Sequence, residues 1–469
     1  MKVEQIYTGC LAQGAYYIES EGEAAVVDPL REVKPYIKKA EQDGAKIKYI
    51  LETHFHADFV SGHLDLAKAS GAEIVYGPLA NPNFGAHIAK DEEVLSLGKA
   101  KIKVLHTPGH TMESTCYLLI DEEGKEQALF TGDTLFIGDV GRPDLAQKAA
   151  HMTQEELAAT LYKSLRTKVM TLSNEVVVYP GHGAGSACGK HMSKETVSTI
   201  GAQKQTNYAL REDMSEEEFV KEVTDGLLPP PAYFPMNVRM NKEGYESIDE
   251  VLSKGIRPLN PEAFEAAANE TGALILDTRD PDVFGEAFIP NAINIGLGGQ
   301  FAPWAGALIP EGQAILLLTD EGKEEEAITR LARVGYDNTL GYLQGGIKAW
   351  KDSGKEVDAV DSVNASDFAQ AYKGHTPVVI DVRKPNEYAS EHVEKAINLP
   401  LDYINEHLAE YPKDETFYLH CAGGYRSMIA ASILKSRGWN NFINVKGGFA
   451  DISKTDVART DYVCPSTLK

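Results

Sequence analysis

Residues 53–63 read THFHADFVSGH and bring three metal-ligand side chains into one short stretch. His54, His56 and Asp58 occupy alternate positions, so all three can face the same way from a loop. A histidine after Asp58 would complete an H-x-H-x-D-H pattern able to hold two metal ions, but Phe59 stands there. Because imidazole and carboxylate groups are common ligands of zinc and iron, the stretch predicts a metal site that lacks one nitrogen ligand.

Four apolar, β-branched runs each end in a polar motif of this kind. They read KIKYILETHFHAD, KIKVLHTPGHT, QALFTGDTLF and NEVVVYPGHG. Each run is typical of a buried strand, so His54, His110, Asp133 and His182 follow the ends of four strands. If these strand ends share one sheet edge, the four side chains meet there, as in many sites built on loops of a rigid sheet.

The ligand types leave two kinds of metal site open. Two histidines and one carboxylate with free coordination positions form the ligand set of oxygen-activating non-haem iron. Three nitrogens around a shared water suit hydrolytic zinc instead. The spacing does not exclude His56 as a ligand.

The motifs THFHAD, TPGHT, TGD and PGHG, in this order, resemble those of the metallo-β-lactamase superfamily over about the first 240 residues. This resemblance implies an N-terminal αββα sandwich. In two-metal members the second ion binds the residues matching Asp58 and His182 and the motif's final histidine, and it shares the residue matching Asp133 with the first ion. Phe59 removes one of those ligands, so we expect a single metal ion.

One-metal members with oxygen chemistry include the persulfide dioxygenases, and the chain resembles bacterial fusions of such an enzyme with rhodanese domains. The resemblance implies one Fe(2+) per chain, held by His54, His110 and Asp133. The other motif residues would then surround the ligands and tune the metal, a role that neighbouring groups commonly have. They are His56, Asp58, His182 and the apolar Phe59.

Two further residues lie on loops predicted to face this site. Arg142, in GDVGRPDL, either contacts carboxylates of a substrate or holds its loop through Asp144. Cys188, in GHGAGSACGK, follows His182 closely; it either takes up a persulfide sulfur or is a small buried thiol.

The second half of the chain contains an internal repeat of about a hundred residues, a feature that decides the architecture. The stretch LILDTRDPDVFGEAFIPNAINI matches VVIDVRKPNEYASEHVEKAINL. Each copy alternates short strands with helices, which predicts a parallel-sheet α/β domain present twice. We expect Asp277 with Arg279, and Asp381 with Arg383, to form structural pairs.

Only the second copy carries a nucleophile, in the loop HCAGGYRS at residues 420–427. The loop resembles the C-x-x-G-x-R-S loop of rhodaneses, and the resemblance covers about residues 360–469. Backbone N–H groups at a helix start lower the pKa of a thiol and favour anions, so Cys421 is the expected nucleophile. Arg426 would hold the anionic sulfur donor or acceptor. The rest of the loop is Ala422, Gly423, Gly424, Tyr425 and Ser427.

The first copy lacks these groups. Its loop reads TDEGKEEE, and the alignment of the two copies places Thr319 on His420, Asp320 on Cys421 and Glu325 on Arg426. Carboxylates repel an anionic sulfur donor, so we expect an inactive module. It would pack against or space the other domains, or bind an unknown partner.

These patterns predict an α/β multidomain chain with three parts. Residues 1–245 form the metallo-β-lactamase-like domain, in which 215–245 hold a helix with a capping box at Ser215 and Glu218 and then an irregular proline-rich linker. Residues 246–356 form the inactive rhodanese-like domain and 357–469 the active one. The length of 469 residues agrees with roughly three domains.

Composition limits the partners and the compartment. The net charge of −23 argues against binding to nucleic acid or to an anionic membrane, and no apolar run resembles a signal peptide or a membrane span. The five cysteines are few and widely spaced, which indicates a reducing cytoplasm. The family resemblance favours a homo-oligomer.

The resemblance implies a bifunctional enzyme. Its iron domain would oxidise a low-molecular-weight thiol persulfide with O2 to sulfite and thiol. The Cys421 domain would move sulfane sulfur between persulfide, sulfite and thiosulfate, and thiosulfate would form from sulfite. Two alternatives are a dinuclear thioester hydrolase of the glyoxalase II kind with an attached sulfurtransferase, and a sulfur-relay protein.

Overall fold

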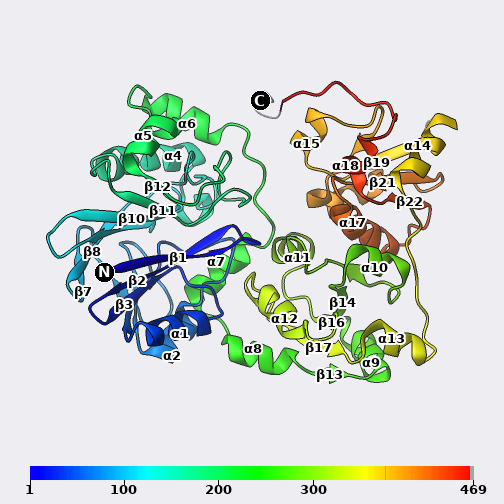
Figure 1. The fold of residues 1–469 in the computed structure, drawn as a ribbon, viewed down its shortest axis with the longest axis horizontal. Helices are drawn as coiled ribbons and strands as arrows, with labels where there is room; N and C mark the ends of the chain where they lie inside the picture. The colour runs from blue at the N-terminus through cyan, green and yellow to red at the C-terminus, as the bar shows by residue number, and fades with distance from the viewer. Residues whose placement is uncertain (375–376, 465–469) are drawn as a thin grey trace. The chain divides into compact units, whose positions relative to one another are not determined.

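The computed structural model describes residues 1–374 and 377–464 (Figure 1). The chain divides into two compact units. The first is Met1–Asp249 with Ala332–Gly335, and the second is Glu250–Leu331 with Tyr336–Lys469.

The first unit contains two mixed sheets of six strands each. One sheet has the order β1 (Lys2–Thr8), β2 (Gln13–Ser20), β3 (Glu23–Val27), β4 (Lys46–Leu51), β5 (Glu73–Tyr76), β6 (His87–Ile88). The other has the order β12 (Ser198–Thr199), β11 (Val177–Pro180), β10 (Glu126–Gly132), β9 (Thr115–Ile120), β8 (Ala100–His106), β7 (Val94–Leu97). Its helices are α1 (Lys34–Gln42), α2 (His63–Ser70), α3 (Gln147–Ala150), α4 (Gln154–Ser164), α5 (Ile200–Thr206), α6 (Glu216–Thr224) and α7 (Phe234–Glu243).

Three buried apolar clusters define the layers of this unit. The central cluster joins side chains of both sheets, such as Tyr16 and Leu51 of one and Tyr117 and Phe130 of the other. A second cluster packs α1 and α2 onto the first sheet, and a third packs α4 and α6 onto the second sheet. Figure 1 shows these helices outside the two sheets. The predicted αββα sandwich is confirmed.

The four strands expected to carry the site exist, but they do not share one sheet edge. β4 belongs to the first sheet, whereas β8, β10 and β11 belong to the second. The condition of a single shared edge is therefore not met; period and composition show that a run is a strand without showing which sheet it joins. The polar loops that follow these strands meet across the sandwich instead.

The end of the first unit is more helical than expected. The capping box of α6 is present, with Ser215 accepting from the Glu218 N–H and the Glu218 side chain accepting from the Ser215 N–H. The irregular linker, however, ends early, because α7 begins at Phe234 with Pro235 in its first turn. Proline is tolerated there, since the N–H groups of the first turn have no partner within the helix. The prediction of a linker up to residue 245 is therefore wrong from Phe234 on.

The second unit contains two five-stranded parallel sheets, as predicted, and α8 (Ile248–Gly255) leads into it. The first module has strands β13 (Pro258–Leu259), β17 (Thr339–Leu343), β16 (Ile315–Leu318), β14 (Leu274–Asp277), β15 (Ile293–Asn294) and helices α9 (Pro261–Thr271), α10 (Pro281–Glu286), α11 (Phe301–Leu308), α12 (Glu324–Ala332), α13 (Gly346–Asp352). The second has strands β18 (Ser362–Val363), β22 (Phe442–Val445), β21 (Phe417–His420), β19 (Val378–Asp381), β20 (Ile397–Asn398) and helices α14 (Ala365–Gly374), α15 (Pro385–Ser390), α16 (Ile404–His407), α17 (Tyr425–Ser436), α18 (Gly448–Ile452).

A buried ion pair recurs in both modules, as expected. The Arg279 Nε lies 2.9 Å from Asp277 Oδ1, and its Nη2 also donates to the Ala287 carbonyl at 2.9 Å. In the second module Arg383 repeats the arrangement, with its Nε 3.0 Å from Asp381 Oδ1. Each pair ties the end of a central strand to the following loop.

Strand pairing corrects the alignment of the two copies by one residue. Leu318 pairs with Asp277 in the first module, where His420 pairs with Asp381 in the second. The first loop residue, Thr319, therefore holds the place of Cys421, and the expected match of Asp320 with Cys421 is wrong. The loop before α12 is one residue longer than the loop before α17. The sequence alignment placed this extra residue at the wrong position.

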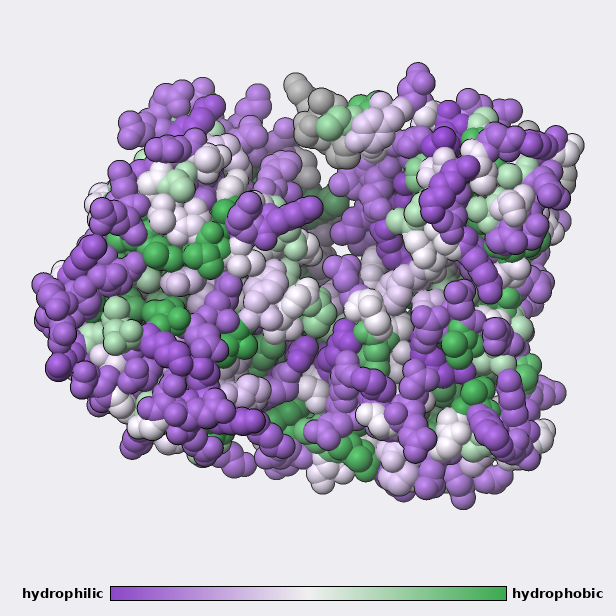
Figure 2. Space-filling view, in the orientation of Figure 1, coloured by the Kyte–Doolittle hydropathy of each residue, from purple (hydrophilic) through white to green (hydrophobic). Residues whose placement is uncertain are grey.

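No helix in the described ranges combines the length and apolar character needed to cross a membrane. Hydrophilic side chains cover most of the face seen in Figure 2.

Asp277→Ala should lower the stability of the second unit by about 3–5 kcal/mol, because it leaves the Arg279 charge buried without its partner. The midpoint of urea unfolding measures the loss. Lys323→Ala is the matched control, since it breaks the exposed pair with Glu326 and should not shift the midpoint. Equal midpoints for the two variants would contradict a structural role of the buried pair.

Candidate functional site

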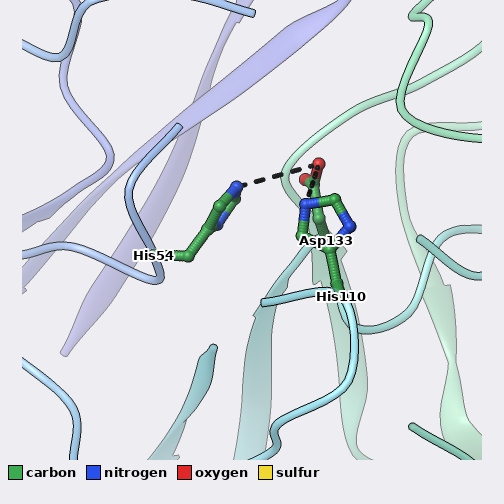
Figure 3. Close-up of side chains that lie close together, drawn as sticks. All are labelled: His54, His110 and Asp133. Atoms are coloured by element: carbon green, nitrogen blue, oxygen red, sulfur yellow. Dashed lines mark ion pairs between the residues drawn. The ribbon is translucent and has the colours of Figure 1, made fainter. Parts of the chain in front are cut away.

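Three of the predicted ligands come together in the first unit (Figure 3). One ligand atom each of His54, His110 and Asp133 lies within 4.8 Å of the other two. Asp133 Oδ2 is 3.9 Å from His54 Nε2 and 3.5 Å from His110 Nε2. All three residues are buried, so they form a compact cluster of two imidazoles and one carboxylate.

The other ring nitrogen of each histidine is already held. His54 Nδ1 lies 3.0 Å from Thr53 Oγ1, and His110 Nδ1 lies 2.9 Å from the Arg142 carbonyl oxygen. These contacts orient both rings so that Nε2 faces Asp133. Hydrogen bonds of this kind commonly fix the tautomer of metal-binding histidines.

The carboxylate of Asp133 has no hydrogen-bond partner among the described residues, although both of its oxygens are buried. A buried carboxylate without donors is costly unless a cation compensates its charge. The donor set of two nitrogens and one carboxylate therefore fits a divalent transition-metal ion such as iron, with coordination positions left open.

Glycines on both sides of Asp133 allow this close approach. A Cβ on Gly132, which has a φ of +48°, would lie 2.5 Å from Thr53 Oγ1. A Cβ on Gly181 would lie 2.6 Å from Asp133 Oδ1. A larger residue at position 132 would push the two sheets apart, and one at position 181 would displace the Asp133 carboxylate.

His56, Asp58 and His182 form a second buried cluster beside the first, also with ligand atoms within 4.8 Å. His182 Nε2 lies 3.3 Å from Asp58 Oδ2 and 3.5 Å from Asp133 Oδ1, so the two clusters adjoin. His56 Nε2 lies 3.0 Å from Asp28 Oδ1. His56 is thus turned toward a carboxylate that does not belong to the first cluster.

The charge states of the histidines differ between the clusters. Burial, with the neighbouring histidines, holds the pKa of His54 well below its usual range, so its imidazole is neutral as a metal ligand must be. Burial also opposes the charge of His56 and His182, but surrounding carboxylates outweigh it. They raise the pKa of His56 to about 9 and that of His182 to about 10.

Phe59 fills the place of the missing nitrogen ligand. It is fully buried, with its ring centroid 4.3 Å from that of His56 and 6.5 Å from that of His182. The ring lies against the second cluster and offers no lone pair to an ion there.

Sequence reasoning missed three buried residues around this loop. Asp28 accepts from the Thr53 N–H and hydroxyl, both at 2.8 Å, and Glu52 accepts from the Ser61 hydroxyl at 2.7 Å. Asn241 donates to the carbonyl oxygens of His56 and Phe59, both at 2.8 Å. Asn241 lies on α7, the helix not expected from the proline-rich sequence; the acidic residues directly after β3 and β4 were the available signal.

Arg142 holds its own loop. Its Nε and Nη2 donate to the two carboxylate oxygens of Asp144 at 2.7 Å each. The guanidinium also donates to the carbonyls of Ala187 and Leu228. The pairing with Asp144 is the structural alternative expected from the sequence, and a contact with substrate stays a prediction.

Cys188 is buried, and its Sγ lies within 4.8 Å of ligand atoms of Asp133 and His182. Burial, together with the Asp58 and Asp133 carboxylates, raises the pKa of this thiol well above its usual value. The sulfur is therefore protonated and a poor nucleophile. This state fits a small buried thiol, and uptake of a persulfide sulfur by Cys188 stays a prediction.

The predicted sulfur-transfer loop, residues 420–427, runs from the last residue of β21 into the first turn of α17 in the second unit. Cys421 follows the last residue of β21, and its Sγ accepts a hydrogen bond of 3.1 Å from the Gly424 N–H. Gly424 has a φ of +100°, which turns its N–H back toward the sulfur. Farther along the loop, the Ser427 hydroxyl donates to the Gly424 carbonyl at 3.1 Å, and the Ala422 carbonyl accepts from the Ala450 N–H at 2.9 Å.

Arg426 is paired in a way that the sequence did not predict. Its Nη1 and Nη2 donate to the carboxylate of Glu387 on α15, at 2.6 and 2.8 Å. Although burial works against the Glu387 charge, Arg426 lowers the pKa of that carboxyl. An anion bound by Arg426 would therefore have to share the guanidinium with Glu387 or displace it.

Two known domain families match the sequence. The profile of the Metallo-beta-lactamase superfamily matches residues 8–182, and that of the Rhodanese-like domain matches residues 260–353 and 364–455. A probable hydroxyacylglutathione hydrolase of Schizosaccharomyces pombe is 33% identical over 189 residues, which are 39% of this chain and 69% of the relative. The chain belongs to the metallo-beta-lactamase superfamily.

Other relatives in the superfamily include the mitochondrial persulfide dioxygenase ETHE1 of Homo sapiens, which is 30% identical over 47% of this chain and 78% of its own length. A solved metallo-beta-lactamase structure from Staphylococcus aureus subsp. aureus COL is 32% identical, with a TM-score of 0.63, over 73% of this chain and 98% of its own. The expected fusion of a metallo-beta-lactamase domain with tandem rhodanese-like domains is thus confirmed. Hydrolase and dioxygenase relatives have similar identities, so the residues of the site must separate the two activities.

Phe59→His should raise the occupancy of the second cluster, because it restores the nitrogen ligand beside His56 and His182. Metal analysis of protein reconstituted with excess metal should then give more than one ion per chain. Phe55→His is the matched control in the same loop, since the Phe55 ring lies against Tyr76, with centroids 4.9 Å apart. If neither the occupancy nor the activity of Phe59→His changed, the explanation for Phe59 would be wrong.

Proposed function

We propose that the chain is a bifunctional enzyme of sulfur metabolism. Its first unit would be an Fe(2+)-dependent dioxygenase that converts a thiol persulfide and O2 to sulfite and thiol. Its Cys421 module would transfer sulfane sulfur and form thiosulfate from sulfite. The observation that carries the proposal is the cluster of His54, His110 and Asp133 beside an apolar Phe59, which favours one metal ion over two.

His54, His110 and Asp133 would hold the iron. When bound, Fe(2+) would supply a redox-active centre with open positions for reaction between a persulfide and O2. Thr53 and the Arg142 carbonyl orient the two imidazoles, and Phe59 walls the site on the side of the second cluster. The buried surroundings keep bulk water from the donors, which strengthens electrostatic interactions inside the site.

Cys421 would carry the transferred sulfur. Its thiolate attacks the outer sulfur of a persulfide R–S–S⁻, the S–S bond breaks, and the thiolate RS⁻ leaves. The Cys421 persulfide that forms is an anion. The Gly424 N–H, which lies within hydrogen-bonding distance of Sγ, would stabilise its negative charge. Sulfite then attacks the outer sulfur, which gives thiosulfate and returns the Cys421 thiolate.

A thioester hydrolase with two metal ions is the second candidate. The hydroxyacylglutathione hydrolase of S. pombe, at 33% identity, and the second cluster of His56, Asp58 and His182 favour it. The absence of a nitrogen ligand at Phe59 and the sulfur-transfer loop of the second unit argue against it. A sulfur-relay protein, in which only Cys421 is active, does not account for the intact ligand set of the first unit.

The proposal includes a reducing, cytoplasmic location and small-molecule partners: a thiol persulfide, O2, sulfite and thiosulfate. Cys10, Cys116, Cys188 and Cys421 are free thiols in the structure, which supports a reducing compartment. The net charge of −23 makes nucleic acid or an anionic membrane an unfavourable partner. Assembly as a homo-oligomer is the remaining part of the proposal.

Anaerobically purified, iron-loaded protein should contain about one iron per chain and should consume O2 when glutathione persulfide is added. A Clark-type electrode follows the uptake, and sulfite is measured in the same sample. Hydrolysis of S-lactoylglutathione is the matched assay for the hydrolase. Two zinc ions per chain with thioester hydrolysis, and no O2 uptake with any of several thiol persulfides, would contradict the dioxygenase.

The two activities should separate by mutation. Cys421→Ser should reduce sulfur transfer about a thousandfold or more, because it removes the nucleophile, while O2 uptake and sulfite release persist. Asp133→Ala should remove iron and O2 uptake while the cleavage of thiosulfate at Cys421 continues. Cys116→Ser, a buried thiol outside both sites, controls for the loss of a thiol. Loss of both activities in either variant would contradict independent sites.

A further inference from the structure

A cavity of about 500 Å³ lies between the sulfur-transfer loop and the corresponding loop of the first, catalytically silent module. Gly423, Gly424 and Tyr425 line it from the active loop. Asp320 and Lys323 line it from the silent loop, which stands where the active module has its nucleophile loop. The two related loops therefore face one cavity, and the silent copy supplies part of its wall.

One residue that lines the cavity also contacts the nucleophile. Gly424 lines the cavity, and its N–H donates to Cys421 Sγ at 3.1 Å. The active loop is also fastened to the first module, since the Tyr425 hydroxyl donates at 2.7 Å to the carbonyl of Gly296, which follows β15. A molecule in the cavity would thus lie against Gly424, the residue that separates it from the Cys421 sulfur.

The charged groups on the wall are mostly negative. Four carboxylates and two ammonium groups line the cavity: Asp280, Asp282, Asp320, Glu326, Lys323 and Lys446. Lys323 pairs with Glu326 at 2.9 Å and Lys446 approaches Asp282 at 3.7 Å. Within the described residues, Asp280 and Asp320 form no ion pair. Two carboxylates are therefore left to attract a cation from the cavity.

An unused hydrogen-bond acceptor is also present. Asn444 lines the cavity and is only 2% exposed, and its Oδ1 has no hydrogen-bond partner among the described residues. A buried acceptor without a donor is unfavourable. An ammonium group carries three donors and a positive charge, so it complements the carboxylates and is the kind of donor that this acceptor lacks.

We propose that this cavity binds the thiol that accepts sulfur from Cys421, and that it prefers a small thiol bearing an ammonium group. The proposal rests on the sulfurtransferase function of Cys421 and names its acceptor. The acceptor thiolate attacks the outer sulfur of the Cys421 persulfide, the bond between that sulfur and Sγ breaks, and a persulfide R–S–S⁻ leaves with Cys421 as the thiolate. The silent module, chiefly through Asp320, then sets the specificity.

Three thiols of similar size and different charge test the preference: cysteamine, 2-mercaptoethanol and 3-mercaptopropionate. With thiosulfate as donor to the full-length protein, kcat/KM should be highest for cysteamine and lowest for 3-mercaptopropionate. Asp320→Asn should raise the KM for cysteamine about two- to fivefold, the effect of one exposed charge. The KM for 2-mercaptoethanol should not change, and kcat with cyanide as a small acceptor should also stay the same.

Glu325→Gln is the matched control, because Glu325 is an exposed carboxylate in the first turn of α12, directly after the same loop, and does not line the cavity. It should leave all three KM values unchanged. Asp320→Lys should reverse the order of cysteamine and 3-mercaptopropionate. Equal KM values for the three thiols, or equal effects of Asp320→Asn and Glu325→Gln, would overturn the acceptor site while leaving the sulfurtransferase intact. No transfer to any acceptor, cyanide included, would overturn the sulfurtransferase itself.

Discussion

The buried carboxylate of Asp133 is the constraint on which the first unit depends. Its two oxygens receive no hydrogen bond among the described residues, and the imidazoles of His54 and His110 face it through their free nitrogens. Burial of such a charge costs several kcal/mol unless a cation compensates it. Gly132 permits the close approach of Thr53 from the other sheet, and Gly181 leaves room for the carboxylate itself.

Much of this arrangement could be predicted from single motifs, because each ligand follows a strand with a clear apolar pattern. The partition of those strands between two sheets could not, since pairing depends on contacts far apart in the chain. Proline composition also misled, because α7 accommodates Pro235 in its first turn. Because α7 was not predicted, Asn241 was not recognised as a site residue. Its amide donates hydrogen bonds to the backbone carbonyls of His56 and Phe59 and so fixes the loop at residues 53–63.

The repeated modules illustrate a different limit. Sequence similarity located both copies and the ion pairs that they share, but it placed Asp320 on Cys421 where strand pairing places Thr319. Loop length differs by one residue, and matching letters cannot show at which position the extra residue lies. The pairing of Arg426 with Glu387 was equally hidden, because its two partners come from α17 and α15, 39 residues apart.

That pairing bears on the proposed sulfur transfer, in which an acidic chain would bind anionic sulfur compounds. Each anion must find local compensation within a molecule of net charge −23. At Cys421 the compensation comes from a backbone N–H and from a guanidinium that Glu387 already holds through two hydrogen bonds. An arriving anion competes with this carboxylate, so it is held less tightly than by a free arginine. Weak retention would suit the proposed sulfur transfer, since a donor that stayed on Arg426 after losing its sulfur would block the acceptor.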